Sequence, residues 1–144
     1  MIIKYDINVS SADDIFLFLL ECDDSFIPKL SSRVNIQEYS IKIFTNSIRF
    51  EAWIDDVMAG LIAMYVNKSF GYITNVSVSQ KHMNYGIASD LMTKCIEYSK
   101  SVSIKKITLE VSENNFSAIK LYEKFSFKVY QKNDDSMFMH LIFE

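Results

Sequence analysis

Glycine, proline and cysteine are all scarce in this chain of 144 residues, which has three, one and two of them respectively. No linker, repeat or low-complexity segment is found, so residues 1–144 are expected to form a single domain. The two cysteines, Cys22 and Cys95, lie in apolar helical contexts and lack the spacing of metal ligands. They are therefore expected to be reduced core residues of an intracellular protein.

Long hydrophobic runs and clusters of positive charge are also missing. The longest apolar run, Ile15 to Leu20, is far too short to span a bilayer, and the N-terminus lacks a signal-peptide core. The 15 basic and 18 acidic residues are scattered and give a net charge of −3, without the basic cluster that nucleic-acid binding needs. The sequence thus predicts a cytoplasmic protein with neither membrane nor nucleic acid as a partner.

Apolar residues are plentiful, at 49% of the chain, and aromatic residues make up 14%. Because a chain of this length buries roughly 70% of its unfolded surface, one proper hydrophobic core is expected. The pattern of apolar residues predicts an α/β protein with a mixed sheet. The expected strands cover residues 1–9, 47–54, 57–66, 70–78, 105–111, 127–131 and 137–143, and the expected helices cover 12–22, 36–44, 87–100 and 116–125, with a loop over 23–32.

Local signals support several of these boundaries. Ser11 is a hydroxyl cap before the first helix, and Asn35 with Glu38 resembles a capping box before the second. Asp55-Asp56 joins two β-rich runs and predicts a hairpin turn. The strand over 70–78 is connected through a helix to the strand over 105–111, so the two are expected to be parallel.

The segment from Tyr72 to Lys100 predicts a strand, a tight turn and a helix that begins just after Gly86. The free N–H groups at the start of a helix can hold an anion without any basic side chain. A glycine at that place is also common in ordinary turns, so this segment alone leaves both interpretations open.

A second block, residues 107–127, decides between them. Taken together, the two blocks resemble the GNAT family, the acetyl-CoA-dependent N-acetyltransferases. The family pattern Gln/Arg-x-x-Gly-x-Gly/Ala falls on residues 83–88, where Gly86 and Ala88 match but Met83 and Asn84 depart from it. The second block matches over Leu109-Glu110-Val111, Asn115, Ala118-Ile119 and Leu121-Tyr122-Glu123-Lys124, and ends in Ser126-Phe127 where Gly-Phe is usual.

The resemblance implies a GNAT fold, with a central mixed sheet of six to seven strands, helices on both faces and two splayed parallel strands. It also implies acetyl-CoA as co-substrate and no metal. The pantetheine arm is expected to pair with the main chain of Val76, Ser77 and Val78, and Asn115 to cap a helix and bind the coenzyme. The pyrophosphate is expected on the turn and first helical residues, namely Met83, Asn84, Tyr85, Gly86, Ile87, Ala88 and Ser89.

Two side chains are candidates for catalysis. By resemblance, Tyr122 protonates the leaving thiolate, since a phenol with a pKa of about 10 keeps its proton at neutral pH. The alternative is a buried aromatic on the apolar face of its helix. Glu110, on a strand between Leu109 and Val111, is expected in an apolar setting and matches a glutamate that serves as base in the ribosomal-protein N-terminal acetyltransferases of the family.

The expected activity is therefore transfer of an acetyl group to a primary amine by direct attack. A small amine or amino sugar is the first choice of acceptor, and a protein N-terminus is the second. No motif guides the choice in the segment from Phe26 to Arg33, which should form part of the acceptor cleft. A non-catalytic acyl-CoA-binding module is the alternative from another class, and a homodimer is allowed because the closing strands pair between subunits in many family members.

Overall fold

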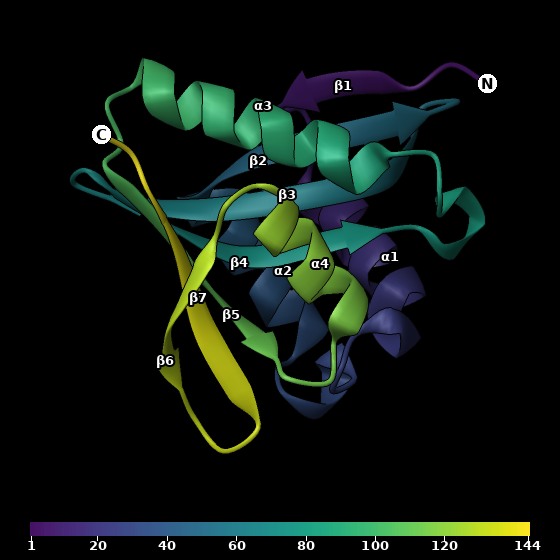
Figure 1. Ribbon diagram of the computed structural model, residues 1–144. Helices are drawn as coiled ribbons and strands as arrows, with labels where there is room; N and C mark the ends of the chain where they lie inside the picture. The colour runs from purple at the N-terminus through teal and green to yellow at the C-terminus, as the bar shows by residue number, and fades with distance from the viewer.

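The computed structural model describes residues 1–144 as one seven-stranded mixed sheet with four α-helices (Figure 1). The strand order is β1-β2-β3-β4-β5-β7-β6, and only the central pair β4–β5 is parallel. The fold class and the parallel pair expected from the sequence are confirmed. In chain order the elements are β1 Lys4–Ile7, α1 Ala12–Cys22, α2 Ile36–Asn46, β2 Ser47–Ile54, β3 Val57–Asn67, β4 Phe70–Val78, α3 Ile87–Ser101, β5 Lys106–Ser112, α4 Phe116–Lys124, β6 Lys128–Lys132 and β7 Ser136–Ile142.

Polar side chains start three of the helices, as their sequence signals predict. Ser11 Oγ accepts from the Asp14 amide at 3.1 Å, and Asp14 Oδ2 accepts from the Ser11 amide at 2.9 Å, which completes a capping box. Asn35 and Asn115 each accept an amide proton from the first turn of their helices, α2 and α4. Each cap satisfies a backbone donor that the helix itself leaves free.

Two sequence-based boundaries were wrong. The first strand was expected over residues 1–9, but β1 is only Lys4–Ile7, because it pairs with β2 over that length and Asn8 then turns into the left-handed region at φ 59°. The expected loop over 23–32 contains two short 3₁₀ turns, Asp23–Ser25 and Leu30–Ser32. These turns are tied together by Asp23 Oδ1, which accepts from the Ser31 amide at 2.7 Å.

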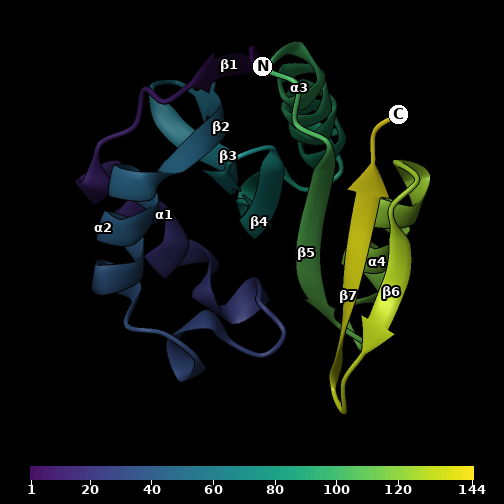
Figure 2. The same cartoon turned by 90° about the vertical axis from the view of Figure 1, so that its left-hand side faces the viewer.

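The sheet has a hydrophobic cluster on each face. Helices α1 and α2 pack over one face, where Ile15 and Ile43 meet Leu61 of β3. Helices α3 and α4 contribute to the other cluster, where Leu91 and Tyr122 pack with residues of β2 to β5 and β7. Figure 2 shows α1 and α2 on one side of the strands and α3 and α4 on the other. Burial of these side chains fixes the two helical layers against the sheet.

The parallel pair at the centre of the sheet is joined at only one end. Pairing of β4 with β5 runs from Phe70↔Lys106 to Ile73↔Leu109 and then stops. Beyond Ile73, the β3–β4 register shifts, so that Thr74 is an extra residue in β4. The two strands diverge from there on (Figure 2). The divergence exposes one edge of β4 and opens the centre of the sheet, where the candidate site lies.

The longest helix, α3, has 15 residues, and no helix has both the length and the apolar character of a membrane span. Both cysteines are free and buried, as expected. No three His, Cys, Asp or Glu side chains cluster closely enough to hold a metal ion.

Candidate active site

The open edge of β4 presents main-chain groups to the gap between the strands. In an antiparallel pair, alternate residues direct their main chain toward the partner strand. The Ser79 amide donates to the Ala59 carbonyl of β3 at 2.9 Å, so Ser77, two residues earlier, also faces β3. The N–H groups of Val76 and Val78 therefore face the gap. Of the three residues expected to offer their main chain there, Ser77 does not.

Helix α3 begins beside this edge with free backbone donors. Its N-cap, Gly86, has φ 76° and offers no side chain, and the first amide bonded within the helix is that of Asp90, which donates to the Gly86 carbonyl. A Cβ on Gly86 would meet no atom within 4 Å, so the space over the turn is open. Lys124 of α4 adds a positive charge here, because its Nζ donates to Ser89 Oγ at 2.9 Å. The arrangement suits a bound anion.

A cavity of about 300 Å³ runs from the open edge of β4 to α4. Its walls include seven residues that the sequence singled out, namely Val76, Ser77, Val78, Met83, Ala88, Asn115 and Tyr122. Phe26, from the loop between α1 and α2, covers it from the other side. The remaining predicted positions, Asn84, Tyr85, Gly86, Ile87 and Ser89, lie outside the cavity wall, in or beside the first turn of α3. Ile87 has a buried side chain and can contribute only its amide.

Tyr122 stands on the last turn of α4, where the backbone is held by a Schellman motif. The Phe127 amide donates to the Tyr122 carbonyl at 3.0 Å, and the Ser126 amide donates to the Glu123 carbonyl at 3.0 Å. The rings of Tyr122 and Phe127 pack with their centroids 5.9 Å apart. Ser126 adopts φ 72° at the position where the motif favours glycine. The motif fixes where the Tyr122 ring enters the core.

The Tyr122 side chain is 6% exposed, so the expectation of a buried helix aromatic describes its ring correctly. Burial, with no opposing hydrogen bond, raises the pKa of its hydroxyl above the ordinary value of about 10. The same residue lines both the 300 Å³ cavity and a second, neighbouring cavity of about 330 Å³. Tyr122 is therefore a core residue that also borders both cavities.

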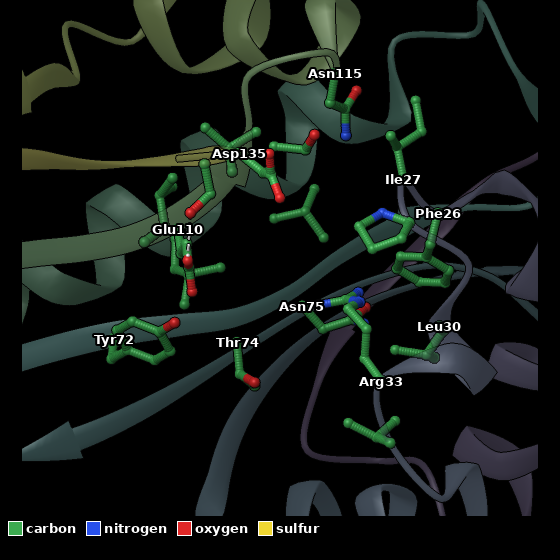
Figure 3. Close-up of a pocket in the computed structure, with 18 of the residues that line it drawn as sticks. Phe26, Ile27, Leu30, Arg33, Tyr72, Thr74, Asn75, Glu110, Asn115 and Asp135 are labelled. Carbon is green, nitrogen blue, oxygen red and sulfur yellow. Dashed lines mark hydrogen bonds between the residues drawn. The ribbon is translucent and has the colours of Figure 1, made fainter. Parts of the chain in front are cut away.

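The second cavity lies between the α1–α2 loop and the open ends of β4 and β5 (Figure 3). Tyr39 of α2 forms part of its wall and anchors α2 to the bulge, since its hydroxyl donates to the Thr74 carbonyl at 2.8 Å. Three charged side chains line it, namely Arg33, Glu110 and Asp135. The cavity therefore offers both signs of charge to a small polar molecule.

Glu110 lies in this second cavity, but not in the setting expected for it. The sequence placed it among apolar neighbours, whereas its side chain is exposed and Ser136 Oγ donates to its Oε2 at 2.6 Å. The strand alternation explains the difference, because Leu109 and Val111 point into the core and Glu110 points the other way. Glu110 and Tyr122 line the same cavity from a strand and a helix.

Several residues of the second cavity were missed by sequence reasoning. The segment from Phe26 to Arg33 was expected near the acceptor without a named role for any side chain. Tyr39, Thr74 and Asp135 were not singled out, and no local signal marks them, because packing of α2 and the β6–β7 turn against the sheet brings them together.

The model of the acetyltransferase (GNAT) family matches residues 15–127 of the chain. No curated protein sequence matches it. Among solved structures, the ribosomal-protein-S18-alanine N-acetyltransferase from Escherichia coli aligns with a TM-score of 0.81 at 16% identity, over 98% of this chain and 94% of that one. The PaiA N-acetyltransferase from Thermoplasma acidophilum, in complex with coenzyme A, gives 0.78 at 14% identity, over 97% and 99%.

A Bacillus subtilis acetyltransferase in complex with CoA aligns with a TM-score of 0.75 at 15% identity, over 99% of this chain and 100% of that one. At such identities these likenesses show a common fold and nothing finer. The family match spans well over half of the sequence, and the chain therefore belongs to the GNAT family of acetyltransferases.

Proposed function

We propose that the protein transfers the acetyl group of acetyl-CoA to a primary amine by direct attack, with Tyr122 as general acid and Glu110 as general base. The observation that carries the proposal is the place of Tyr122, whose side chain borders the cavity beside β4 and the cavity that holds Glu110. A donor in the first cavity and an acceptor in the second would meet next to its hydroxyl.

The first cavity and the adjoining first turn of α3 fit the coenzyme. The N–H groups of Val76 and Val78 face the gap and suit the amides of a pantetheine arm. The free amides that follow Gly86, with Lys124 beside them, suit a diphosphate. The open space over Gly86 allows a phosphate to approach the backbone closely. When bound, acetyl-CoA supplies the thioester whose acetyl group is transferred.

Tyr122 is suited to give a proton to the departing sulfur. Burial raises the pKa of its hydroxyl, so the hydroxyl is protonated at neutral pH and a proton is present when the thiolate leaves. A main-chain N–H on the open edge of β4 can polarise the thioester carbonyl, as donors in oxyanion holes do. These two groups act on opposite ends of the bond that breaks.

Glu110 is suited to take a proton from the acceptor. Its carboxylate lies in the second cavity, is exposed, and is oriented by the Ser136 hydroxyl at 2.6 Å. An ammonium group near it would lose a proton to the carboxylate, directly or through water, and become the neutral amine that attacks. As the amide forms, the nitrogen loses its second proton to solvent; Glu110 also releases its proton to solvent, and Tyr122 recovers one from solvent after the thiol has left.

A small amine or amino sugar is the preferred acceptor, since about 330 Å³ is at the lower end of the range for small-molecule pockets. A protein N-terminus is the second candidate. It is supported by Glu110 on β5, which matches the glutamate that serves as base in the ribosomal-protein N-terminal acetyltransferases that this chain resembles. The cytoplasm, where acetyl-CoA is found, is the proposed location.

The test is thiol release from acetyl-CoA in the presence of a panel of amines, with Tyr122→Phe compared with the unchanged protein. We expect the turnover number to fall roughly 100- to 10,000-fold, the usual contribution of a positioned acid. Calorimetry should find the affinity for acetyl-CoA unchanged. Tyr98→Phe is the matched control. It also removes one phenol hydroxyl, but the Tyr98 ring packs on Phe50 in another part of the core.

The possible results separate the alternatives. Turnover that survives in Tyr122→Phe would remove this residue from the mechanism. Tight binding of acetyl-CoA without turnover on any small amine or peptide N-terminus would instead identify a non-catalytic acyl-CoA-binding module.

A further inference from the structure

The charged groups of the second cavity have no partners of opposite charge. The ion pairs of the molecule are Lys4–Asp6, Lys29 with Asp23 and Asp24, and Arg49–Glu51. Arg33, Glu110 and Asp135 take part in none of them, although all three line the cavity. Glu110 accepts a hydrogen bond from Ser136, whereas the guanidinium of Arg33 makes no hydrogen bond to the rest of the chain. The cavity thus has a cation whose five donors are free.

The two signs of charge lie on opposite walls. Arg33 follows the 3₁₀ turn Leu30–Ser32 in the α1–α2 loop, while Glu110 is on β5 and Asp135 precedes β7. Figure 3 shows Arg33 on the side of Leu30 and Phe26, with the two carboxylates across the cavity. Burial and then the charge of Glu110 raise the pKa of Tyr72, and Arg33 acts in the opposite direction, so the field of both charges reaches this residue.

Resting on the proposed function, we infer that the acceptor is a small molecule that carries a carboxylate as well as its amine, and that Arg33 binds the carboxylate. The amine end of such a molecule is attracted to Glu110 and Asp135, which line the cavity together with Tyr122. A planar guanidinium binds a carboxylate through two parallel hydrogen bonds, which fixes the direction of the ligand as well as holding it. Arg33 is then a specificity-determining residue.

The coenzyme does not account for the free guanidinium. The cavity beside β4 that fits the coenzyme does not include Arg33 in its wall. The first turn of α3, which fits the diphosphate, already has Lys124 as its cation. A neutral amine or an amino sugar would leave Arg33 without a partner, and a peptide N-terminus has an amide where this acceptor has its carboxylate.

The test compares linear amino acids from glycine to 6-aminohexanoate, each with the amide of the same chain length, as acceptors for acetyl-CoA. At one length at least, kcat/KM for the acid should exceed that for the amide roughly 10- to 100-fold, the value of a hydrogen-bonded ion pair. The preference for the acid should come from a lower KM, with kcat similar for acid and amide, and it should weaken as salt is added. In Arg33→Gln the preference should vanish, and Arg33→Lys should keep part of it.

Lys128→Gln is the matched control, because it removes one positive charge from the exposed strand β6, away from both cavities. Calorimetry with the N-acetylated acid and the N-acetylated amide gives a second readout without turnover, and the acid should bind more tightly only when Arg33 is present. Equal use of acids and amides at every length, or a preference that survives Arg33→Gln, overturns this inference and leaves the acetyltransferase intact. If no amine of any kind causes thiol release from acetyl-CoA, both this inference and the proposed acetyltransferase activity are overturned.

Discussion

The cavity beside β4 and the cavity between the α1–α2 loop and β5 share Phe26, Val76, Asn115 and Tyr122, but they differ in the groups that they could offer to a ligand. The cavity beside β4 has a mostly apolar wall with the N–H groups of Val76 and Val78, and the free amides of the first turn of α3 lie next to it. The other cavity presents charged and hydroxyl side chains instead, of which Arg33 and Glu110 are examples. In the proposed reaction, binding of the donor would thus depend on backbone groups and binding of the acceptor on a few side chains.

This difference bears on the departures from the family pattern in the glycine-rich turn. Met83 and Asn84 replace usual residues of the glycine-rich turn, but the amides after Gly86 remain free whatever side chains precede them. A single change at Arg33 would remove the only positive charge from the lining of the acceptor cavity, and a change at Glu110 would remove one of its two carboxylates. If the two cavities are independent, changes in one should leave binding to the other unaltered, which makes the comparison testable.

Among changes that affect only one of the two cavities, the largest effect is expected from Glu110→Gln in the acceptor cavity. We expect kcat/KM for the acceptor to fall about 100-fold, because the amide accepts no proton but keeps the shape of the side chain. The dissociation constant of acetyl-CoA, measured by calorimetry, should not change. Ser136→Ala is the milder companion, since it removes only the hydrogen bond at 2.6 Å that orients the carboxylate. A loss of coenzyme affinity in Glu110→Gln would break the division between the cavities.

In the donor cavity, Gly86→Ala should weaken acetyl-CoA binding at least about tenfold, the equivalent of one lost hydrogen bond to a charged group. The added Cβ meets no protein atom and would instead occupy the space left for the ligand. Alanine at this position would have to adopt the left-handed φ of 76°, which should also lower the free energy of unfolding by about 1 kcal/mol.

Gly86→Asn separates these two effects. Asparagine adopts left-handed conformations more readily than alanine, so stability should recover while coenzyme affinity stays low. Recovery of both quantities in the Asn variant would mean that strain, and not the obstruction of the ligand, caused the weaker binding.

A smaller effect is expected at Ser126, in the Schellman motif that ends the helix of Tyr122. Ser126→Gly should raise the free energy of unfolding by roughly 0.5–1 kcal/mol, because a serine held at φ 72° is replaced by the residue that the motif favours. Urea unfolding measures the gain, and the turnover number should be unaltered. Ser103→Gly, at another left-handed serine with φ 62°, is the control away from the site. A change in turnover with Ser126→Gly would show that strain at this serine affects Tyr122.

The smallest effect concerns pH. The raised pKa of Tyr122 means that its proton stays in place as the pH rises toward the ordinary phenol value of about 10. The rate should therefore rise as the acceptor amine loses its proton, and then stay level up to about pH 10. A descending limb below about pH 9 that disappears in Tyr122→Phe would contradict this behaviour.

Features with a local cause could be predicted from the sequence. Ser11, Asn35 and Asn115 cap helices because their side chains reach backbone donors only three residues away. Asp55 and Asp56 form the expected hairpin turn, with φ of 50° and 63°. The motif around Tyr122 placed it on a helix, and the family match confirmed the fold.

Features that depend on distant parts of the chain could not be predicted. The exposure of Glu110 follows from which face of β5 meets the core, and sequence neighbours alone suggested the wrong environment. The free guanidinium of Arg33 became significant only when the loop, β5 and the β6–β7 turn were seen to line one cavity. The bulge at Thr74, which starts the divergence of β4 from β5, has no signal in the residues around it.

The two adjoining cavities, which share part of their lining, also bear on the kinetic mechanism of the proposed reaction. Donor and acceptor can be present together in a ternary complex, so a covalent acyl-enzyme and a ping-pong pathway are not required. Double-reciprocal plots of the initial rate should then give intersecting lines. Free coenzyme A should be a competitive inhibitor toward acetyl-CoA but not toward the acceptor.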